Sequence, residues 1–168
     1  MPAHLPAKDP VDIFMWRRID QRLTSSGQPG EEQLAALKAI GITHIVNLGL
    51  HTHERALPDE ARSVRALGLD YVHIPVDFDN PTESDFDRFR ATMQALEGET
   101  IHVHCIANLR VSAFLYRYRR DELQLPAAMV RDEMDHIWRP GGAWAVFTGN
   151  TGEKALPHRF AGRDYAPE

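Results

Sequence analysis

The stretch of sequence that decides the fold reads Ile101-His102-Val103-His104-Cys105-Ile106-Ala107-Asn108-Leu109-Arg110-Val111-Ser112. The run from residue 100 to 104 predicts a short buried strand. After it, Ala113, Phe114 and Tyr118 fall at helical spacing and predict a helix over residues 110–120. The sequence therefore places a tight loop, from Cys105 to Arg110, where a strand ends and a helix begins.

This loop has the residues of an anion-binding site built around a reactive cysteine. Peptide N–H groups and the macrodipole at a helix N-terminus stabilise an anion, and helix N-termini and nearby cations also favour the thiolate form of a cysteine. A lone cysteine is often core filler, but the His-Cys pair, the arginine and the strand–loop–helix order together favour a catalytic nucleophile at Cys105. The cradle would be formed by the backbone N–H groups of Ile106, Ala107, Asn108, Leu109 and Arg110.

The flanking sequence alternates between strand and helix patterns. We expect an edge strand or hairpin over 13–20, a turn cluster over 25–30, helices over 31–40, 58–67, 81–96 and 126–138, and strands over 42–48 and 70–76. Such alternation indicates one α/β domain with a central, mainly parallel sheet flanked by helices and with the anion loop at a strand carboxyl end. We place this domain at residues 12–140, after a loose leader (1–11) and before a C-terminal extension (141–168) that packs on the domain or trails from it.

Composition narrows the function class. The chain has 168 residues, 43% hydrophobic and 26% charged, with a formal net charge of −5, which suits a globular domain and disfavours a nucleic-acid-binding one. A single cysteine rules out an internal disulfide, and neither a signal peptide nor a membrane span is visible. We therefore expect a cytoplasmic protein without a cofactor or metal, and the oligomeric state is left open.

The loop and its surroundings resemble the cysteine-dependent protein tyrosine and dual-specificity phosphatases, in particular the compact bacterial tyrosine-phosphatase-like members. Their signature is Val/Ile-His-Cys, five residues, Arg, then Ser or Thr. The resemblance runs from about Thr24 to Trp138 and includes the motifs Ser26-Gly27-Gln28-Pro29, Ile45-Val46-Asn47-Leu48 and Ile74-Pro75-Val76-Asp77.

The resemblance implies a cysteinyl-phosphate mechanism acting on a phosphorylated protein or a small phosphomonoester. Cys105 would attack phosphorus, Arg110 and the loop amides would hold the oxygens, and an aspartic acid would protonate the leaving group. His104 would be a structural residue that tunes the cysteine, and Ser112 falls where the family has its Ser or Thr.

The loop departs from the family pattern because four residues, not five, separate Cys105 from Arg110, so that Val111 stands in the usual register of the arginine. Four is also the loop length of rhodanese-type sulfurtransferases, whose cysteine carries a persulfide. Two alternatives follow: a sulfurtransferase, or a phosphatase-like module that binds phosphate with little turnover.

The general acid should come from the loop that precedes the predicted helix over 81–96. In dual-specificity enzymes the acid lies about ten residues before a helix phenylalanine, and Phe89 places that position at Asp79, with Asp77 as the close alternative. The stretch from Asp79 to Thr82 is also a good loop and helix-cap sequence, so neither aspartate need be the acid.

Other polar clusters have ordinary explanations. The histidines at 51, 53, 102 and 104 lack the spacing that completes a zinc site. The loop over 51–55 could shape a substrate mouth, but a solvated surface loop is the simpler interpretation. The basic, aromatic run over 116–120 suits the end of a helix, where cations complement the dipole. Trp138 and Trp144 could cap the site or close the core.

Overall fold

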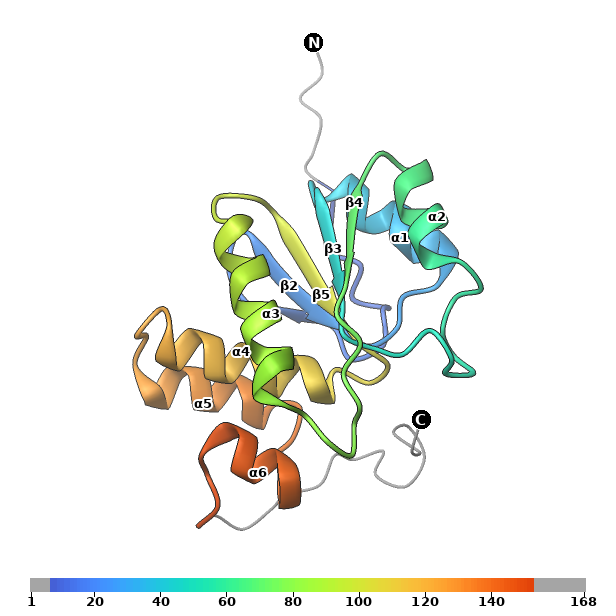
Figure 1. Ribbon diagram of the computed structural model, residues 1–168. Helices are drawn as coiled ribbons and strands as arrows, with labels where there is room; N and C mark the ends of the chain where they lie inside the picture. Colours follow the sequence, from blue (N-terminus) through green and yellow to red (C-terminus); the bar gives the residue numbers. More distant parts are fainter. Residues whose placement is uncertain (1–6, 153–168) are drawn as a thin grey trace.

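The computed structural model describes residues 7–152 and arranges them around a five-stranded sheet with helices on both faces (Figure 1). The strand order is β1-β2-β5-β3-β4, and every neighbouring pair is parallel except β1 and β2. The predicted single α/β domain with a mainly parallel sheet is confirmed. In chain order the elements are β1 (Arg17–Arg18), β2 (Leu23–Ser26), α1 (Glu31–Ala39), β3 (His44–Asn47), α2 (Glu60–Ala66), β4 (Asp70–His73), α3 (Glu83–Ala95), β5 (Ile101–His104), α4 (Leu109–Asp121), α5 (Ala127–Asp135) and α6 (Gly142–Thr148).

The central strand β5 positions the cysteine. It pairs in parallel with β2 on one side and with β3 on the other, and all four of its residues are buried. Cys105 is the next residue along the chain. The cysteine therefore sits at the carboxyl end of the middle strand, the place where open α/β sheets bind ligands.

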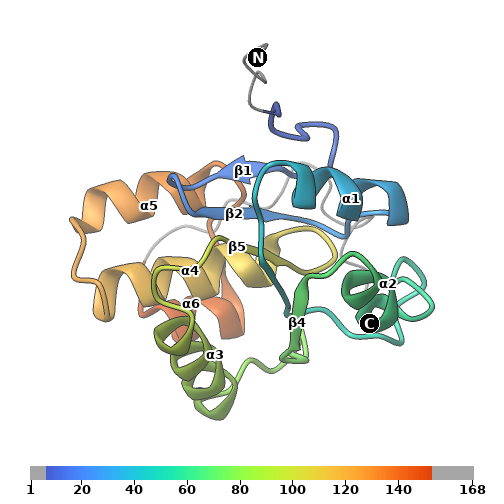
Figure 2. The ribbon, with the colours of Figure 1, turned by 90° about the horizontal axis from the view of Figure 1, so that it is seen from above.

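The two faces of the sheet are covered by different sets of helices. Helices α1 and α2 lie together on one face, and α3, α4, α5 and α6 lie on the other (Figure 2). The smaller cluster of buried apolar side chains includes Leu34, Leu37, Ile45 and Val64, and the larger one centres on α4. Helix α4 contacts α3, α5 and α6, so the helix that begins at the anion loop is also the hub of the larger core.

Strand β2 was missed by the sequence analysis, which placed a turn cluster over residues 25–30. Its residues Leu23-Thr24-Ser25-Ser26 are mostly polar, yet all four are buried. The three hydroxyls have hydrogen-bonding partners in the interior: those of Thr24 and Ser26 bind the His102 ring, and that of Ser25 accepts from Asn108. Buried polar groups are tolerated when they are hydrogen-bonded, so this strand carries no hydrophobic pattern to read.

Helix α6 was not predicted either, because its residues lie in a stretch interrupted by Gly and Pro. It buries Trp144 and Phe147 in the larger core, within the part of the chain that we had assigned to a C-terminal extension. Residues 153–168 of that extension, and residues 1–6 of the leader, lie outside the described residues.

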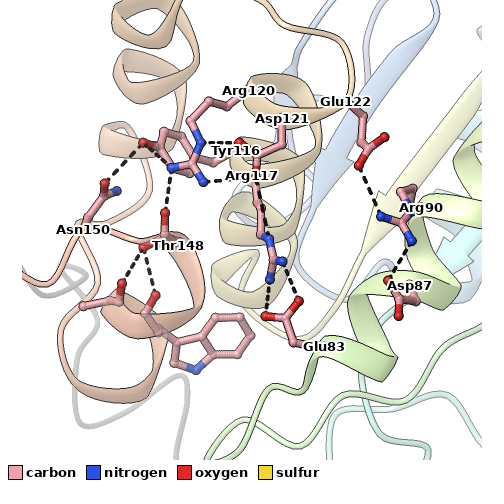
Figure 3. Close-up of polar contacts among 12 residues, drawn as sticks. Glu83, Asp87, Arg90, Tyr116, Arg117, Arg120, Asp121, Glu122, Thr148 and Asn150 are labelled. Carbon is pink, nitrogen blue, oxygen red and sulfur yellow. Dashed lines mark hydrogen bonds and ion pairs between the residues drawn. The ribbon is translucent and has the colours of Figure 1, made fainter.

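The basic run over 116–120 holds α4 to its neighbours. The Arg117 guanidinium donates to both carboxylate oxygens of Glu83 on α3 (Figure 3). The same guanidinium lies over the Phe86 ring, 4.1 Å from its centre. Arg120 donates to the carbonyl oxygen of Thr148 in α6 at 2.6 Å. These contacts give the arginines a role in packing, which agrees with the interpretation of the run as a helix end.

Phe114 on α4 is the best single test of this packing, because it is fully buried and its ring contacts those of Phe86, Phe89, Trp144 and Phe147. We expect Phe114→Ala to lower the free energy of unfolding by about 3–5 kcal/mol. Val146→Ala, at a position that is 69% exposed on α6, should change it by less than about 0.5 kcal/mol. Chemical denaturation measures both, and equal effects would contradict the packing described above.

Candidate active site

The loop after β5 is short and closely held. Cys105 is 1% exposed and Arg110 is 3% exposed, and helix α4 begins at Leu109, one residue earlier than predicted. Asn108 precedes the helix with φ +65° and ψ +5°, in the left-handed region. Because Asn adopts that conformation more readily than most residues other than Gly, it suits the point where a four-residue loop must turn into a helix.

The carbonyl groups and the N–H groups of the loop differ in their hydrogen bonding. The carbonyl oxygen of Cys105 accepts a hydrogen bond from Nδ1 of His104 (3.1 Å), and that of Ile106 accepts from the backbone N–H of Gln28 (3.0 Å). By contrast, within residues 7–152 no protein acceptor binds the N–H groups of residues 106–109. Four N–H groups beside a helix N-terminus form the kind of nest that binds an anion.

The Asn108 side chain holds the turn in place through two hydrogen bonds. Its Nδ2 donates to the carbonyl oxygen of Met15 (2.9 Å) and to Oγ of Ser25 (3.1 Å), and the residue is fully buried. From the sequence, only the backbone N–H of Asn108 is expected to contribute to the site. The structure gives its side chain a second role, since it ties the loop to β2 and to the segment before β1.

Two glycines lie against the loop, and at Gly27 the absence of a side chain is what allows the approach. A Cβ placed on Gly27 would overlap the Ile106 carbonyl oxygen and lie 2.8 Å from the Phe14 ring. A Cβ on Gly49 would lie 3.4 Å from Ile106 and 3.5 Å from the Cα of Cys105. The sequence motif around Gly27 thus has a steric reason, because only a residue without a side chain fits against this carbonyl.

A buried ion pair lies behind the nucleophile. Nε2 of His104 lies 2.7 Å from Oε2 of Glu60, and both side chains are essentially inaccessible. Glu60 also accepts from Nε2 of Gln28 at 2.7 Å. Burial acts to raise the pKa of Glu60, but the charge and hydrogen bond of His104, together with hydrogen bonds from Gln28 and Tyr71, outweigh it and hold that pKa below its usual value.

The second histidine of the strand is neutral. His102 is buried between the Thr24 and Ser26 hydroxyls, which hydrogen-bond its two ring nitrogens at 2.7 and 2.8 Å. Burial, reinforced by the charge of His104, moves the pKa of His102 well below its ordinary value. Its ring stacks on Trp16. Within residues 7–152, no three His, Cys, Asp or Glu side chains group as metal ligands.

The arginine of the loop reaches the segment that carries the candidate acids. Nη1 of Arg110 donates to the carbonyl oxygen of Val76 (2.9 Å), and its guanidinium lies 6.0 Å from the centre of the Phe78 ring. Asp77 stands between these two contacts, and it is exposed, as is Asp79. The structure therefore brings Arg110, from the same loop as Cys105, against the segment that carries both aspartates.

The aspartate segment is itself ordered by local hydrogen bonds. One carboxylate oxygen of Asp77 accepts from the N–H of Asp79 (2.9 Å), and the Phe78 carbonyl accepts from the Trp144 indole (2.7 Å). Farther along, Thr82 caps α3 and exchanges hydrogen bonds with Asp85, as a capping box does.

Ser112 lies on α4 and uses its hydroxyl inside the fold. The hydroxyl donates to the carbonyl oxygen of Leu109 (2.9 Å) and accepts from the Trp138 indole (3.0 Å). Its hydrogen is thus donated within the helix, and in this arrangement Ser112 supports α4 and joins it to Trp138.

The loop geometry can be set beside known proteins. No family model matches the chain. A crystal structure of a candidate phosphatase (DUF442) from Shewanella putrefaciens superposes with a TM-score of 0.74 at 35% identity, covering 83% of this chain and 91% of that one. This chain belongs to the DUF442 family of candidate phosphatases. A second crystal structure of the same Shewanella protein superposes with a TM-score of 0.70 at 32% identity over 84% of this chain.

More distant proteins share parts of the chain or the fold alone. Beta-lactamase hydrolase-like proteins of Agrobacterium fabrum and Xylella fastidiosa are 34% identical over 96 residues and 30% identical over 127 residues. This DUF442 chain spans only 22% and 28% of their lengths. Pseudomonas aeruginosa TpbA, solved in complex with phosphotyrosine, has a TM-score of 0.61 at 18% identity over 80% of this chain, a likeness that shows the fold.

Glu60 is the site residue that sequence reasoning missed. Glu60 lies in the first turn of α2, where an acidic side chain complements the helix dipole and is usually exposed. It is instead 2% exposed, and its partner His104 lies 44 residues away in sequence. No local pattern signals such a contact. Gln28 was noticed only as part of a motif.

Gly27 tests how the loop is held. We expect Gly27→Ala to lower the free energy of unfolding by about 1–3 kcal/mol, since the new methyl group would displace the Ile106 carbonyl. It should also weaken binding of phosphate or vanadate, as measured by calorimetry. Gly152→Ala is the matched control, because a Cβ there meets nothing within 4 Å. Tight anion binding by a stable Gly27→Ala variant would show that this contact does not shape the loop.

Proposed function

We propose that this chain hydrolyses phosphate monoesters through a cysteinyl-phosphate intermediate on Cys105. The observation that carries the proposal is the loop after β5, in which the Cys105 and Ile106 carbonyls are engaged while the N–H groups of residues 106–109 have no acceptor within residues 7–152. A tetrahedral oxyanion needs such donors around its equatorial oxygens. Membership of a family of candidate phosphatases supports the same reaction class.

In the first step, the Cys105 thiolate attacks phosphorus and the bond from phosphorus to the leaving oxygen breaks. The leaving oxygen takes a proton from an aspartic acid. In the second step, the same aspartate removes a proton from water, whose oxygen attacks phosphorus and breaks the P–S bond. Phosphate and the thiolate are released. Arg110 and the loop amides stabilise the negative charge in both steps.

Two contacts favour Asp77 over Asp79 as the acid. Asp77 directly follows Val76, whose carbonyl binds Arg110, and directly precedes Phe78, whose ring lies beside the same guanidinium. Its carboxylate also accepts the Asp79 N–H, which would hold it in place while its other oxygen carries the proton. Asp79, which the family spacing favours, adjoins Phe78 but does not adjoin Val76.

The substrate class that fits the site is a phosphate monoester. A phosphorylated protein or a small phosphomonoester presents the dianion that the loop would hold. TpbA binds phosphotyrosine on the same fold, which makes an aryl phosphate the first substrate to try. Among the described helices, none combines the length and the apolar character needed to cross a bilayer.

The length of the loop, four residues, favours sulfur transfer as a second candidate function. Rhodanese-type enzymes share that loop length, and a persulfide on Cys105 would be stabilised by the same N–H groups.

Purified protein is therefore assayed with an aryl phosphate and, separately, with thiosulfate and cyanide. We expect phosphate release that Cys105→Ser abolishes. Turnover of thiosulfate alone would contradict the proposal. Lack of turnover with a melting temperature raised by phosphate would leave a binding module.

Separate substitutions of the two aspartates test the acid. We expect Asp77→Asn to reduce kcat for an aryl phosphate by about 10²- to 10⁴-fold, while Asp79→Asn reduces it much less. The effect of Asp77→Asn should shrink for substrates whose leaving group needs no proton. The opposite order of effects would assign the role to Asp79, and no effect of either would rule out this loop as the acid's source.

A further inference from the structure

The hydrogen bonds of His104 define its protonation state. Its Nδ1 faces the carbonyl oxygen of Cys105 at 3.1 Å, and its Nε2 faces the carboxylate of Glu60 at 2.7 Å. A carbonyl oxygen only accepts hydrogen bonds, and so does an ionised carboxylate. The pKa of Glu60 lies below its usual value, which favours the ionised carboxylate at neutral pH. Beside an ionised Glu60 both ring nitrogens donate, so that His104 is an imidazolium paired with the carboxylate.

This pair adjoins the nucleophile because His104 directly precedes Cys105 and donates to its carbonyl oxygen, while the buried Arg110 guanidinium belongs to the other end of the loop. The two side chains of the pair are 0% and 1% exposed, so solvent screens them little. The imidazolium belongs to the residue next to Cys105, and the carboxylate lies on its far side, on α2. The positive end of the pair therefore faces the loop.

Other titratable groups around the pair are neutral near pH 7. Burial, together with the charge of His104, depresses the pKa of His102 on β5. Burial likewise lowers the pKa of His73 on β4 and raises that of Tyr71 on the same strand. Farther out, the exposed His51 stacks on His73 at 3.7 Å and hydrogen-bonds the Tyr71 phenol. Arg65 is charged and also acts on Tyr71, so charge on this side of the sheet is carried by the His104–Glu60 pair and by Arg65.

Glu60 also fixes the frame of the loop. Its second oxygen accepts from the Gln28 side chain, and the Gln28 backbone N–H holds the Ile106 carbonyl. One carboxylate thus connects to both carbonyl groups that are turned away from the nest: to that of Cys105 through His104, and to that of Ile106 through Gln28.

We propose that Glu60 is a positioning residue that keeps His104 charged behind Cys105 and thereby favours the thiolate. The inference rests on the proposed function only in assigning the thiolate a catalytic use. Glu60 touches no substrate and acts through His104. An imidazolium that donates to the Cys105 carbonyl draws electron density from that peptide and places positive charge beside the sulfur, and both effects stabilise the anion.

The Glu60→Gln substitution removes the negative charge of the side chain and keeps its shape. The amide is nearly isosteric with the carboxylate, and it can donate to Nε2 of His104 while Nδ1 still donates to the Cys105 carbonyl. His104 would keep its place as a neutral ring. Glu83→Gln is the matched control, because Glu83 is an acid whose ion pair with Arg117 lies on α3 at the protein surface.

The readout does not depend on turnover. Since Cys105 is the single cysteine of the chain, the rate of alkylation by iodoacetamide reports on it alone, with Cys105→Ser as the blank. The ratio of the rate at pH 7 to the rate at pH 9.5 cancels differences in access and measures the thiolate fraction. We expect Glu60→Gln to lower this ratio by about fivefold or more, while Glu83→Gln leaves it unchanged.

The possible outcomes are distinct. An unchanged ratio in a folded Glu60→Gln variant, even one that has lost activity, would overturn the proposal and leave Glu60 a structural residue. A lowered ratio in a protein that hydrolyses no phosphate ester would support the role of Glu60 and contradict the phosphatase function. If Glu60→Gln does not fold, Glu60→Asp keeps the carboxylate, and its ratio should stay within about twofold of the wild type, whereas a ratio as low as that expected for the neutral amide would overturn the proposal.

Discussion

Everything at the candidate site depends on the direction of two peptide groups. The carbonyl of Cys105 is held by His104 and that of Ile106 by Gln28, at 3.1 and 3.0 Å. A peptide plane is rigid, so fixing its carbonyl oxygen also fixes the N–H on its opposite side. With both carbonyls held, the N–H groups of Ile106 and Ala107 point away from these tethers, beside a helix N-terminus that adds its own partial positive charge. The proposed anion site thus depends on carbonyls that are engaged elsewhere.

The surrounding fold supplies those tethers from distant parts of the chain. Strand β5 is central, so segments after β2 and β3 approach the loop from both sides, and on the β2 side Gly27 makes the approach possible. Asn108 fastens the turn to β2 and takes the left-handed conformation that the short loop needs. The loss of one residue relative to the five-residue loop of tyrosine phosphatases is thus accommodated by a side chain that anchors the turn and by a helix that starts early.

Much of this architecture could be predicted from the sequence, and the failures have physical reasons. The α/β alternation and the strand–loop–helix around Cys105 follow from periodic apolar positions, which are local signals. Strand β2 could not be predicted because it lacks a hydrophobic pattern. Its buried residues are mostly Ser and Thr, whose hydroxyls hydrogen-bond to histidine and asparagine side chains. Glu60 was missed because a first-turn acid looks the same whether it faces water or His104. Contacts between residues far apart in sequence leave no trace in a single chain.

The central claim is that the loop binds an oxyanion through its own peptide groups, and amide NMR during a phosphate titration tests it most directly. With ¹⁵N-labelled protein, the account predicts that phosphate shifts the N–H resonances of residues 106–109 together and saturably. The side-chain resonance of Arg110 should move with the same apparent Kd. Saturable shifts confined to other parts of the molecule, or no shifts at millimolar phosphate, would contradict it.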